Sequence, residues 1–337
     1  MKTSIKSHLS QHTNLLYFEF KMGIHLLTTF LRNLRENGSY KTPLSKLSGK
    51  RIVVDASIYL YRFKAMDALI ENIYLLCTLF RVNDISALFV FDGKSMKNKT
   101  ETILKRKEQR DAAKREYFNI MKRVENLSPN DREEQEEKMT QLRRKFVKVT
   151  CDDIKEVKGM LDAYGIKYIT AINEADEVCS AIVIKGAAYA CLSEDTDLFA
   201  YGCPRVLKYI SLLNHTVVVY PLEKILESVG MKFTEFRQLC ILSGTDYNES
   251  HRNIFTFYKL FTRYKQRPNT LDFLSWLSLN NKITLRKYYQ VKDVFDIYNK
   301  NPSEILNKIR YCLIKNRAVN KPALKHILSN NGFIFVN

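Results

Sequence analysis

The sequence predicts an α/β fold in which helices flank a parallel sheet. Short runs of β-branched residues recur along the chain, several of them end in an acidic residue, and each leads toward a segment with helical periodicity. The chain has 337 residues, of which 45% are apolar, so it can bury a substantial core. This length fits one large domain or two closely packed ones.

Four segments support the predicted sheet. They are Arg51–Asp55, Ala87–Asp92, Tyr168–Asp176 and Tyr189–Asp197. In the third segment, the acids would fall at the start of a helix that runs to about Lys185. Ligands of open α/β sheets bind beyond the carboxyl ends of the strands, where residues far apart in the sequence converge. We therefore expect the functional site at this edge.

Residues 94–150 interrupt the alternation with a highly charged segment that we interpret as a helical insertion. The segment contains no glycine and only one proline, Pro129. If its first part is one helix, Lys99, Arg106 and Arg110 would lie within roughly 40° of one another. A solvated helical face is the ordinary interpretation of such a charge run. The position of the segment directly after Asp92 favours contacts with phosphate groups instead.

Three parts follow from this pass along the chain. Residues 1–21 form an N-terminal extension, residues 22–230 form the core with its insertion at about 94–150, and residues 231–337 form a helical region. No strand of comparable strength follows Met231, and the helical region carries more Lys, Arg and Tyr than acid.

The net charge of +18 favours a polyanionic partner, because binding of Lys and Arg to phosphates releases condensed counterions. Nucleic acid is the first candidate. An acidic membrane surface would fit the charge as well, but apolar runs such as Ile73–Phe80 fall far short of the roughly 20 residues that span a bilayer. No secretory signal is expected at the N-terminus.

The seven cysteines are odd in number, include no CxxC pair and mostly lie in apolar segments. We expect reduced, intracellular core residues. They are Cys77, Cys151, Cys179, Cys191, Cys203, Cys240 and Cys312.

Seven carboxylates are predicted to gather at the active edge. They are Asp55, Asp92, Glu174, Asp176, Asp195, Asp197 and Asp246. Such a cluster repels itself unless protons or cations compensate it, and oxygen ligands without His or Cys suit Mg²⁺ or Mn²⁺ rather than Zn²⁺. Two such ions can assist an in-line displacement at a phosphodiester. An isolated Asp after a strand is often only a helix cap, so the ordered set carries the prediction.

In chain order, these residues resemble the XPG-type structure-specific nuclease family, which includes flap endonucleases and related 5′ exonucleases. The resemblance runs from Met22 to about Arg252, and its motifs are specific together but weak singly. The motifs are Met22-Gly-Ile, Val54-Asp55-Ala-Ser, Val90-Phe-Asp92-Gly-Lys, Glu174-Ala-Asp176, Glu194-Asp195-Thr-Asp197 and Leu239-Cys-Ile-Leu-Ser-Gly-Thr-Asp246-Tyr.

The resemblance implies a PIN-like core and a role for each motif. It implies that Asp55, Asp92, Glu174 and Asp176 help form a first metal site, and that Asp195, Asp197 and Asp246 complete a second. Lys99 and Arg106 match residues that contact the scissile phosphate, with Arg110 assisting. Tyr61 matches a tyrosine that stacks on a displaced base, although a core tyrosine is an equal alternative. Residues up to Arg143, Arg144 and Lys145 would form an arch through which a 5′ end passes.

Three departures from the family pattern matter. Family members begin at Met-Gly with the glycine near the bound DNA, whereas Gly23 follows 21 extra residues; either Met22 is the true start or the extension swings aside. The helix-two-turn-helix of the family carries Gly-x-Gly, whereas this chain reads Asn253-Ile-Phe-Thr256, so the resemblance does not extend to duplex binding there. The tail Phe333–Asn337 does not match a sliding-clamp motif.

The sequence therefore predicts a monomeric Mg²⁺-dependent nuclease that uses two ions and acts on DNA with 5′ flaps, nicks or ends, in replication, repair or recombination. Flap endonuclease and 5′ to 3′ exonuclease activity both stay open. The alternative is a DNA-junction binder that keeps the fold without turnover. Family function implies a nuclear or host-nuclear location, or a cytoplasmic replication site if the chain is viral, which the short region after Asp246 would allow.

Overall fold

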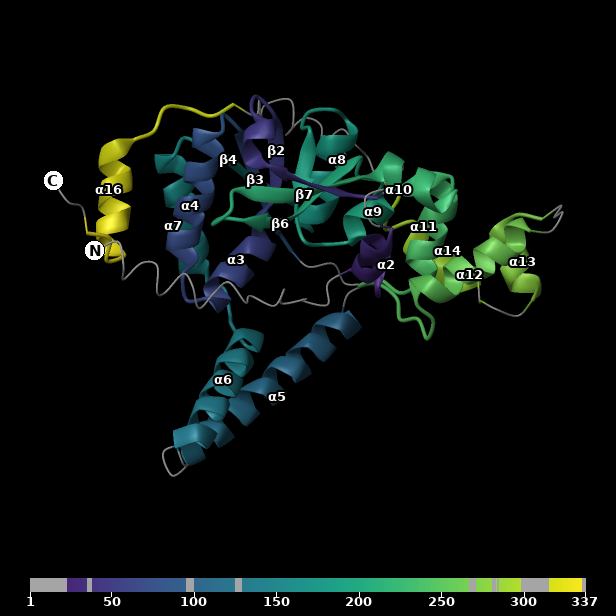
Figure 1. Ribbon diagram of the computed structural model, residues 1–337, viewed down its shortest axis with the longest axis horizontal. Coiled ribbons are helices and arrows are strands. Elements are labelled where there is room, and N and C mark those ends of the chain that lie inside the picture. The colour runs from purple at the N-terminus through teal and green to yellow at the C-terminus, as the bar shows by residue number, and fades with distance from the viewer. Residues whose placement is uncertain are drawn as a thin grey trace.

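The computed structural model describes residues 23–34, 38–94, 100–124, 129–266, 271–280, 283, 285–297 and 315–334. A seven-stranded sheet forms its centre (Figure 1). The strands are β1 (Tyr40–Pro43), β2 (Arg51–Asp55), β3 (Ser86–Phe91), β4 (Lys167–Thr170), β5 (Ala190–Leu192), β6 (Arg205–Ser211) and β7 (Thr216–Pro221).

The strands are ordered β1-β7-β6-β5-β2-β3-β4 across the sheet. The five strands from β6 to β4 in this order run parallel, which confirms the predicted parallel sheet. Strands β7 and β1 extend the sheet with antiparallel pairings that the sequence did not predict. A short turn joins β6 to β7, and strands linked so closely can pair only in the antiparallel direction.

One face of the sheet packs against helices from the first part of the chain and from its end. These are α3 (Ala56–Ala65), α4 (Leu69–Val82), α7 (Cys151–Ala163), α16 (Lys321–Asn330) and the 3₁₀ helix η2 (Leu44–Leu47). In α4 the buried residues Leu69, Ile73, Leu76 and Phe80 recur at helical spacing, so they form one apolar side. The late helix α16 lies beside α7 on this face (Figure 1).

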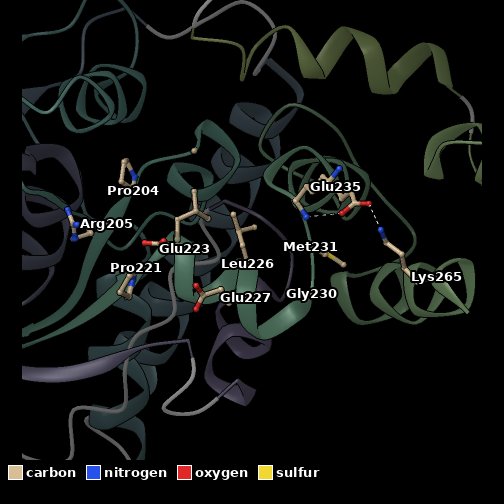
Figure 2. A pocket seen from close by; sticks show the side chains of 13 residues that line it. Pro204, Arg205, Pro221, Glu223, Leu226, Glu227, Gly230, Met231, Glu235 and Lys265 are labelled. Atoms are coloured by element: carbon tan, nitrogen blue, oxygen red, sulfur yellow. Dashed lines mark hydrogen bonds and ion pairs between the residues drawn. The ribbon is translucent and has the colours of Figure 1, made fainter.

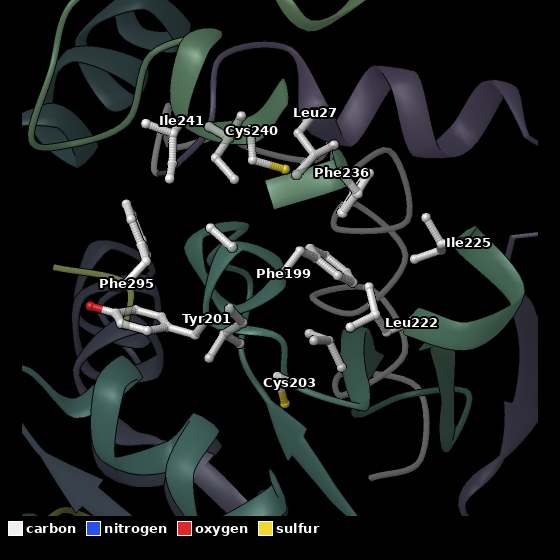
Figure 3. Close-up of a cluster of buried hydrophobic side chains, with 14 of the residues drawn as sticks. Leu27, Phe199, Tyr201, Cys203, Leu222, Ile225, Phe236, Cys240, Ile241 and Phe295 are labelled. Atoms are coloured by element: carbon white, nitrogen blue, oxygen red, sulfur yellow. The ribbon is translucent and has the colours of Figure 1, made fainter. Parts of the chain in front are cut away.

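The other face packs against helices that also carry the helical region after residue 231. They are α2 (Leu27–Asn33), α8 (Ala175–Ile184), α9 (Asp197–Tyr201), α10 (Leu222–Val229), α11 (Phe233–Leu242), α12 (Ile254–Lys265), α13 (Phe273–Leu279) and α14 (Leu285–Lys292). Figure 3 shows Phe199 and Tyr201 of α9 among apolar side chains that include Phe236 of α11. One hydrophobic cluster therefore joins the sheet to the predicted helical region.

The insertion forms two helices, α5 (Thr100–Val124) and α6 (Pro129–Lys145), which lie side by side and project from the sheet (Figure 1). Their contact buries Ala113 and Leu142, and the ring of Tyr117 lies 5.4 Å from that of Phe146. The prediction of a helical insertion is correct for the part of it that the structure describes.

Five of the cysteines are buried and free, as expected, whereas Cys151 is exposed at the start of α7. The expectation of a core position was wrong for Cys151, because Thr150 caps α7 and leaves the first turn of this helix at the surface. Cys312 lies outside the described residues. Within the described ranges, no helix is both long and apolar enough to cross a membrane.

Candidate active site

The carboxyl ends of three neighbouring parallel strands carry acidic residues. Asp55 is the last residue of β2, Asp92 directly follows β3, and Asp195 lies three residues beyond the end of β5. β2 pairs in parallel with both β3 and β5, so the three strands end at one edge of the sheet. The predicted edge is therefore the place where these residues lie.

Asp55 lies in a crowded acidic environment. Its side chain is buried, and burial raises the pKa of this carboxyl well above its ordinary value. The negative charges of Asp92 and Asp195 raise the pKa further, which places both carboxylates near Asp55. Ser193 donates a hydrogen bond of 2.9 Å to Asp55 Oδ2, which opposes the shift. Such a cluster is the electrostatic environment that a cation would relieve.

Asp92 is connected to the start of α8. Its Oδ1 accepts a hydrogen bond of 2.8 Å from the backbone N–H of Ala175, which follows Glu174. Gly93 makes this approach possible, because a Cβ at Gly93 would lie 2.1 Å from the carbonyl oxygen of Ala171. The loop after β3 and the loop after β4 are therefore pressed together, and Asp92 and Glu174 share one side of the site.

The second acid of the Glu-Ala-Asp motif lies deeper. Asp176 is buried in the first turn of α8, while Glu174 is partly exposed and accepts a hydrogen bond of 2.7 Å from Tyr247 Oη. Burial and the charges of Asp176 and Glu174 raise the pKa of Tyr247, so this phenol stays a proton donor. Tyr247 thus links the Glu174 loop to the segment that carries Asp246.

Asp195 and Asp197 lie on a tightly held turn. Asp195 Oδ1 accepts a hydrogen bond of 2.8 Å from the N–H of Asp197, and Asp197 is fully buried at the start of α9. The turn is anchored from behind because Leu198, Phe199, Ala200 and Tyr201 are all buried. The apolar side chains around α9, drawn in Figure 3, therefore fix the position of this helix and of Asp195 and Asp197 at its start.

Gly23 lies against this turn rather than apart from it. Its φ is +77°, and a Cβ there would lie 2.4 Å from Asp195 Oδ1 and from Thr196 Oγ1. The next N–H, that of Ile24, donates a hydrogen bond of 2.8 Å to Thr196 Oγ1. Only glycine satisfies both the backbone conformation and the contact. Whether Gly23 also contacts DNA stays a prediction, and Met22 and the extension before it lie outside the described residues.

Asp246 is held by the insertion. Arg106 of α5 donates to both carboxylate oxygens of Asp246, at 2.8 Å each, and the adjacent Lys105 forms an ion pair with Glu249. Two consecutive cations of the insertion therefore contact the segment that follows α11. Arg106 therefore lies against an acid of the candidate site, while its predicted contact with the reacting phosphate stays a prediction.

The other predicted DNA contacts are spread along the surface. Tyr61 is 39% exposed on α3, so the alternative of a core tyrosine is wrong, whereas its stacking role stays a prediction. Arg110 on α5 and Arg144 on α6 are partly exposed, and Arg143 is exposed with its Nη2 3.4 Å from Asp67 Oδ2. Lys99 lies outside the described residues.

The donor set fits Mg²⁺ by its chemistry, since every candidate ligand is a carboxylate and no His or Cys belongs to the set. In the described part of the chain, no three carboxylate, imidazole or thiolate groups are close enough to hold one ion as they stand. The ion pair of Asp246 with Arg106 is one physical reason, because a guanidinium takes a ligand position.

A pocket of about 640 Å³ lies elsewhere, beside α10 and α11 (Figure 2). Its lining includes Glu235, which pairs with Lys265 at 2.8 Å, and none of the seven candidate acids. The candidate site is therefore the open sheet edge rather than this pocket.

Sequence reasoning missed the residues that hold the acids in place. Ser193 and Tyr247 lie beside predicted ligands and make hydrogen bonds to Asp55 and Glu174. Their position next to the motifs in the sequence could have identified them. Lys208, which is buried behind the Asp195 turn, had no such signal.

Two family regions match this chain: the XPG N-terminal domain over residues 22–113 and the XPG I-region over residues 165–246. Flap endonuclease 1 of Entamoeba histolytica is 30% identical over 275 residues, which cover 75% of this chain and 70% of that protein. Flap endonuclease 1 of Mus musculus is 29% identical over 249 residues, and the match spans 69% of this chain but only 63% of the mouse protein.

Among solved structures, the catalytic core of Rad2 in complex with a DNA substrate aligns with a TM-score of 0.63. The alignment covers 91% of this chain and 95% of the Rad2 chain at 22% identity, so it shows the shared fold. The sequence matches, the parallel sheet and the order of the acidic residues along the chain are all consistent with one family. The chain belongs to the XPG/Rad2/FEN1 family of structure-specific nucleases.

Proposed function

We propose that this chain is a metal-dependent DNA nuclease that hydrolyses phosphodiesters at 5′ flaps, nicks or ends, in replication, repair or recombination. The observation that supports the proposal most is the gathering of carboxylates, most of them buried, at one sheet edge, with Arg106 of the insertion against one of them. Flap endonuclease 1 relatives and the Rad2 core bound to DNA make a DNA substrate the natural choice.

Each acid has a proposed place. Asp55, Asp92, Glu174 and Asp176 would hold a first Mg²⁺, and Asp195, Asp197 and Asp246 would complete a second. When bound, these ions would supply the positive charge that draws a phosphodiester into an acidic pocket and polarises its oxygens. Mn²⁺ has the same preference for oxygen ligands and is expected to substitute.

The chain's own residues would orient the substrate. Arg106 Nη2 can donate hydrogen bonds to phosphate oxygens as it does to both oxygens of Asp246, and Lys99 is proposed to act beside it. Gly23 keeps the backbone close to the Asp195 turn. Tyr61, Arg110, Arg143 and Arg144 are proposed to contact the DNA away from the reacting bond.

The test is incubation of the purified chain with labelled 5′ flap, nicked and blunt DNA, in Mg²⁺ or in EDTA. We expect cleavage in Mg²⁺ alone. Asp197→Asn should lower the single-turnover rate by more than about 10²-fold. Mutation of a group that only orients a metal ligand already lowers metal affinity or activity 10-fold to 100-fold, and Asp197 is itself a proposed ligand. DNA affinity should stay similar or rise, since the phosphate contacts remain.

Asp152→Asn is the matched control, because Asp152 is exposed on α7 and pairs only locally with Lys155 in the contacts that the structure describes. It should cleave like the unmodified chain. Metal-independent binding without cleavage of any of the three substrates would contradict the proposal and identify a DNA-junction binder.

A further inference from the structure

Lys208 is buried directly behind the acidic turn. It lies on β6, and only 2% of its surface is exposed. Lysine is almost never fully buried unless its ammonium is paired, because removing that charge from water is costly. Lys208 Nζ donates a hydrogen bond of 2.5 Å to the backbone oxygen of Glu194, the residue before Asp195. The burial of this ammonium is therefore coupled to the position of the turn.

The backbone beside Lys208 is shaped for the same contact. Tyr209 has a φ of +57°, which non-glycine residues rarely adopt, and the pairing of β6 with β7 shifts register between Lys208 and Ser211. The N–H of Tyr209 donates a hydrogen bond of 2.7 Å to Glu194 Oε1. Two consecutive residues of β6 thus hold Glu194, one at its backbone oxygen and one at its carboxylate.

Neighbouring groups stabilise this anchor. Arg62 Nη1 of α3 lies 3.7 Å from Glu194 Oε1, and Arg32 Nη2 of α2 donates a hydrogen bond of 3.1 Å to Tyr209 Oη. Glu194 is therefore held by residues of β6 and α3. Arg32 of α2 in turn holds Tyr209, whose N–H donates to Glu194. This number of contacts explains how a strained backbone persists at Tyr209.

Movement of Glu194 would reach both neighbouring acids. On one side Ser193 bonds Asp55, and its Oγ accepts a hydrogen bond of 3.0 Å from the N–H of Asp195. On the other side Asp195 Oδ1 accepts the N–H of Asp197. The turn from Ser193 to Asp197 is thus one hydrogen-bonded unit with Glu194 as its point of attachment.

We propose that Lys208 is a positioning residue, which holds the 193–197 turn through Glu194 so that Asp195 and Asp197 face the metal site. The inference rests on the metal-binding part of the proposed function. Mutation of a residue that orients metal ligands from behind typically lowers metal affinity 10-fold to 100-fold. Lys208 touches neither substrate nor reacting atoms in this role.

The test compares Lys208→Met and Lys208→Arg with the unmodified chain. Mn²⁺ binding is measured without DNA, from the electron paramagnetic resonance signal of the free ion. Lys208→Met fills a similar volume without the charged donor, so we expect about 10-fold weaker Mn²⁺ binding. Lys208→Arg restores a cationic donor and should recover most of the affinity. Single-turnover cleavage should need correspondingly more Mg²⁺, while the rate at saturating metal falls less.

The matched control is Lys224→Met, which removes an exposed lysine of α10 that contacts the ring of Tyr40. It should bind Mn²⁺ like the unmodified chain. Equal losses in Lys224→Met and Lys208→Met would overturn the proposal, because net charge alone would then explain them. A folded Lys208→Met with unchanged Mn²⁺ affinity would also overturn it.

If Lys208→Met does not fold, Glu194→Ala tests the other half of the anchor, because it removes the partly exposed carboxylate that accepts from the Tyr209 N–H and keeps the backbone oxygen. A loss of about 3-fold or more in Mn²⁺ affinity supports the proposal, and unchanged affinity contradicts it. Mn²⁺ binding without cleavage of any DNA would refute the proposed nuclease activity alone, and the Lys208 comparison would keep its meaning.

Discussion

Burial has two opposing effects on Asp55. Its position at the end of β2 is set by Ile52, Val53 and Val54, all fully buried, and the same burial makes its negative charge costly. The neighbouring acids Asp92 and Asp195 add repulsion. This residue, which is proposed to hold a metal ion, is therefore a source of instability while no cation is bound.

Asp55→Asn should raise the stability of the metal-free protein by about 1 kcal/mol at pH 8. The folded pKa of Asp55 is raised, so the folded state holds a proton that the unfolded chain has released between the two pKa values. The contribution of Asp55 to stability is thus present at low pH and lost as the pH rises through the folded pKa. The gain from Asp55→Asn should shrink toward pH 5.

Thermal unfolding in EDTA at both pH values measures this gain, with Asp152→Asn as the exposed control. The variant should also lose the rise in melting temperature that Mg²⁺ causes in the unmodified chain. A lower melting temperature than the unmodified chain at pH 8 in EDTA would show that Asp55 is not strained by its neighbours.

The residues that sequence analysis placed well are those that end a strand. Asp55 and Asp92 follow apolar runs, so the parallel order of the strands brings them together. Lys208 could not be found this way, because a lysine in a strand pattern predicts a solvent-facing position. Its burial depends on the irregular pairing of β6 with β7 and on Glu194, which are tertiary facts.

At the scale of elements, the two insertion helices pack mainly against each other. Described links to the rest of the molecule include the ion pairs of Lys105, Arg106 and Arg143, together with a small contact between α3 and α6. Exposed or partly exposed ion pairs contribute little to stability. The insertion is therefore attached to the core by contacts that can be exchanged at small cost.

Replacement of residues 100–145 by a short Gly/Ser linker should leave the melting temperature of the core within a few degrees. Cleavage of 5′ flaps under single-turnover conditions should fall by about 10²-fold or more, because the deletion removes Arg106, which is proposed to act beside the reacting phosphate. Calorimetry and the flap assay measure the two effects. A large drop in melting temperature would mean that α5 and α6 belong to the core.

The elements themselves were predictable to different degrees. The four strand segments with apolar runs were found because their pattern is local. Strands β1, β6 and β7 were missed, and of these Tyr40–Pro43 is mostly exposed and pairs through β7. The return of α16 to α7 was also not readable, because it depends on contacts such as the hydrogen bond between Asn331 and Glu156.

At the scale of the whole molecule, charge is distributed unevenly. The chain carries a net +18, yet the sheet edge gathers acids, and the insertion beside it carries cations. A polyanion would therefore be held chiefly by the basic surroundings, and only its reacting group would enter the acidic edge. Binding and cleavage should respond to different variables.

DNA affinity, measured in EDTA, should fall by about 10³-fold or more between 50 and 200 mM salt, the range for six to ten phosphate contacts. Arg110→Ala and Arg143→Ala should each reduce the slope of log affinity against log salt by about 1, without changing substrate preference. Fluorescence anisotropy provides the measurement. A salt-independent affinity would contradict phosphate contacts as the basis of binding.

The backbone from Gly23 to His25 contacts residues far along the chain. The backbone following it bonds Thr196 through Ile24, and the N–H of His25 donates to the carbonyl oxygen of Gly244 at 3.1 Å. After residues 23–25 have left the ribosome, more than two hundred further residues must be synthesised before Gly244 emerges. The candidate site is thus assembled late in translation, so a nascent chain interrupted before Gly244 would lack a complete site.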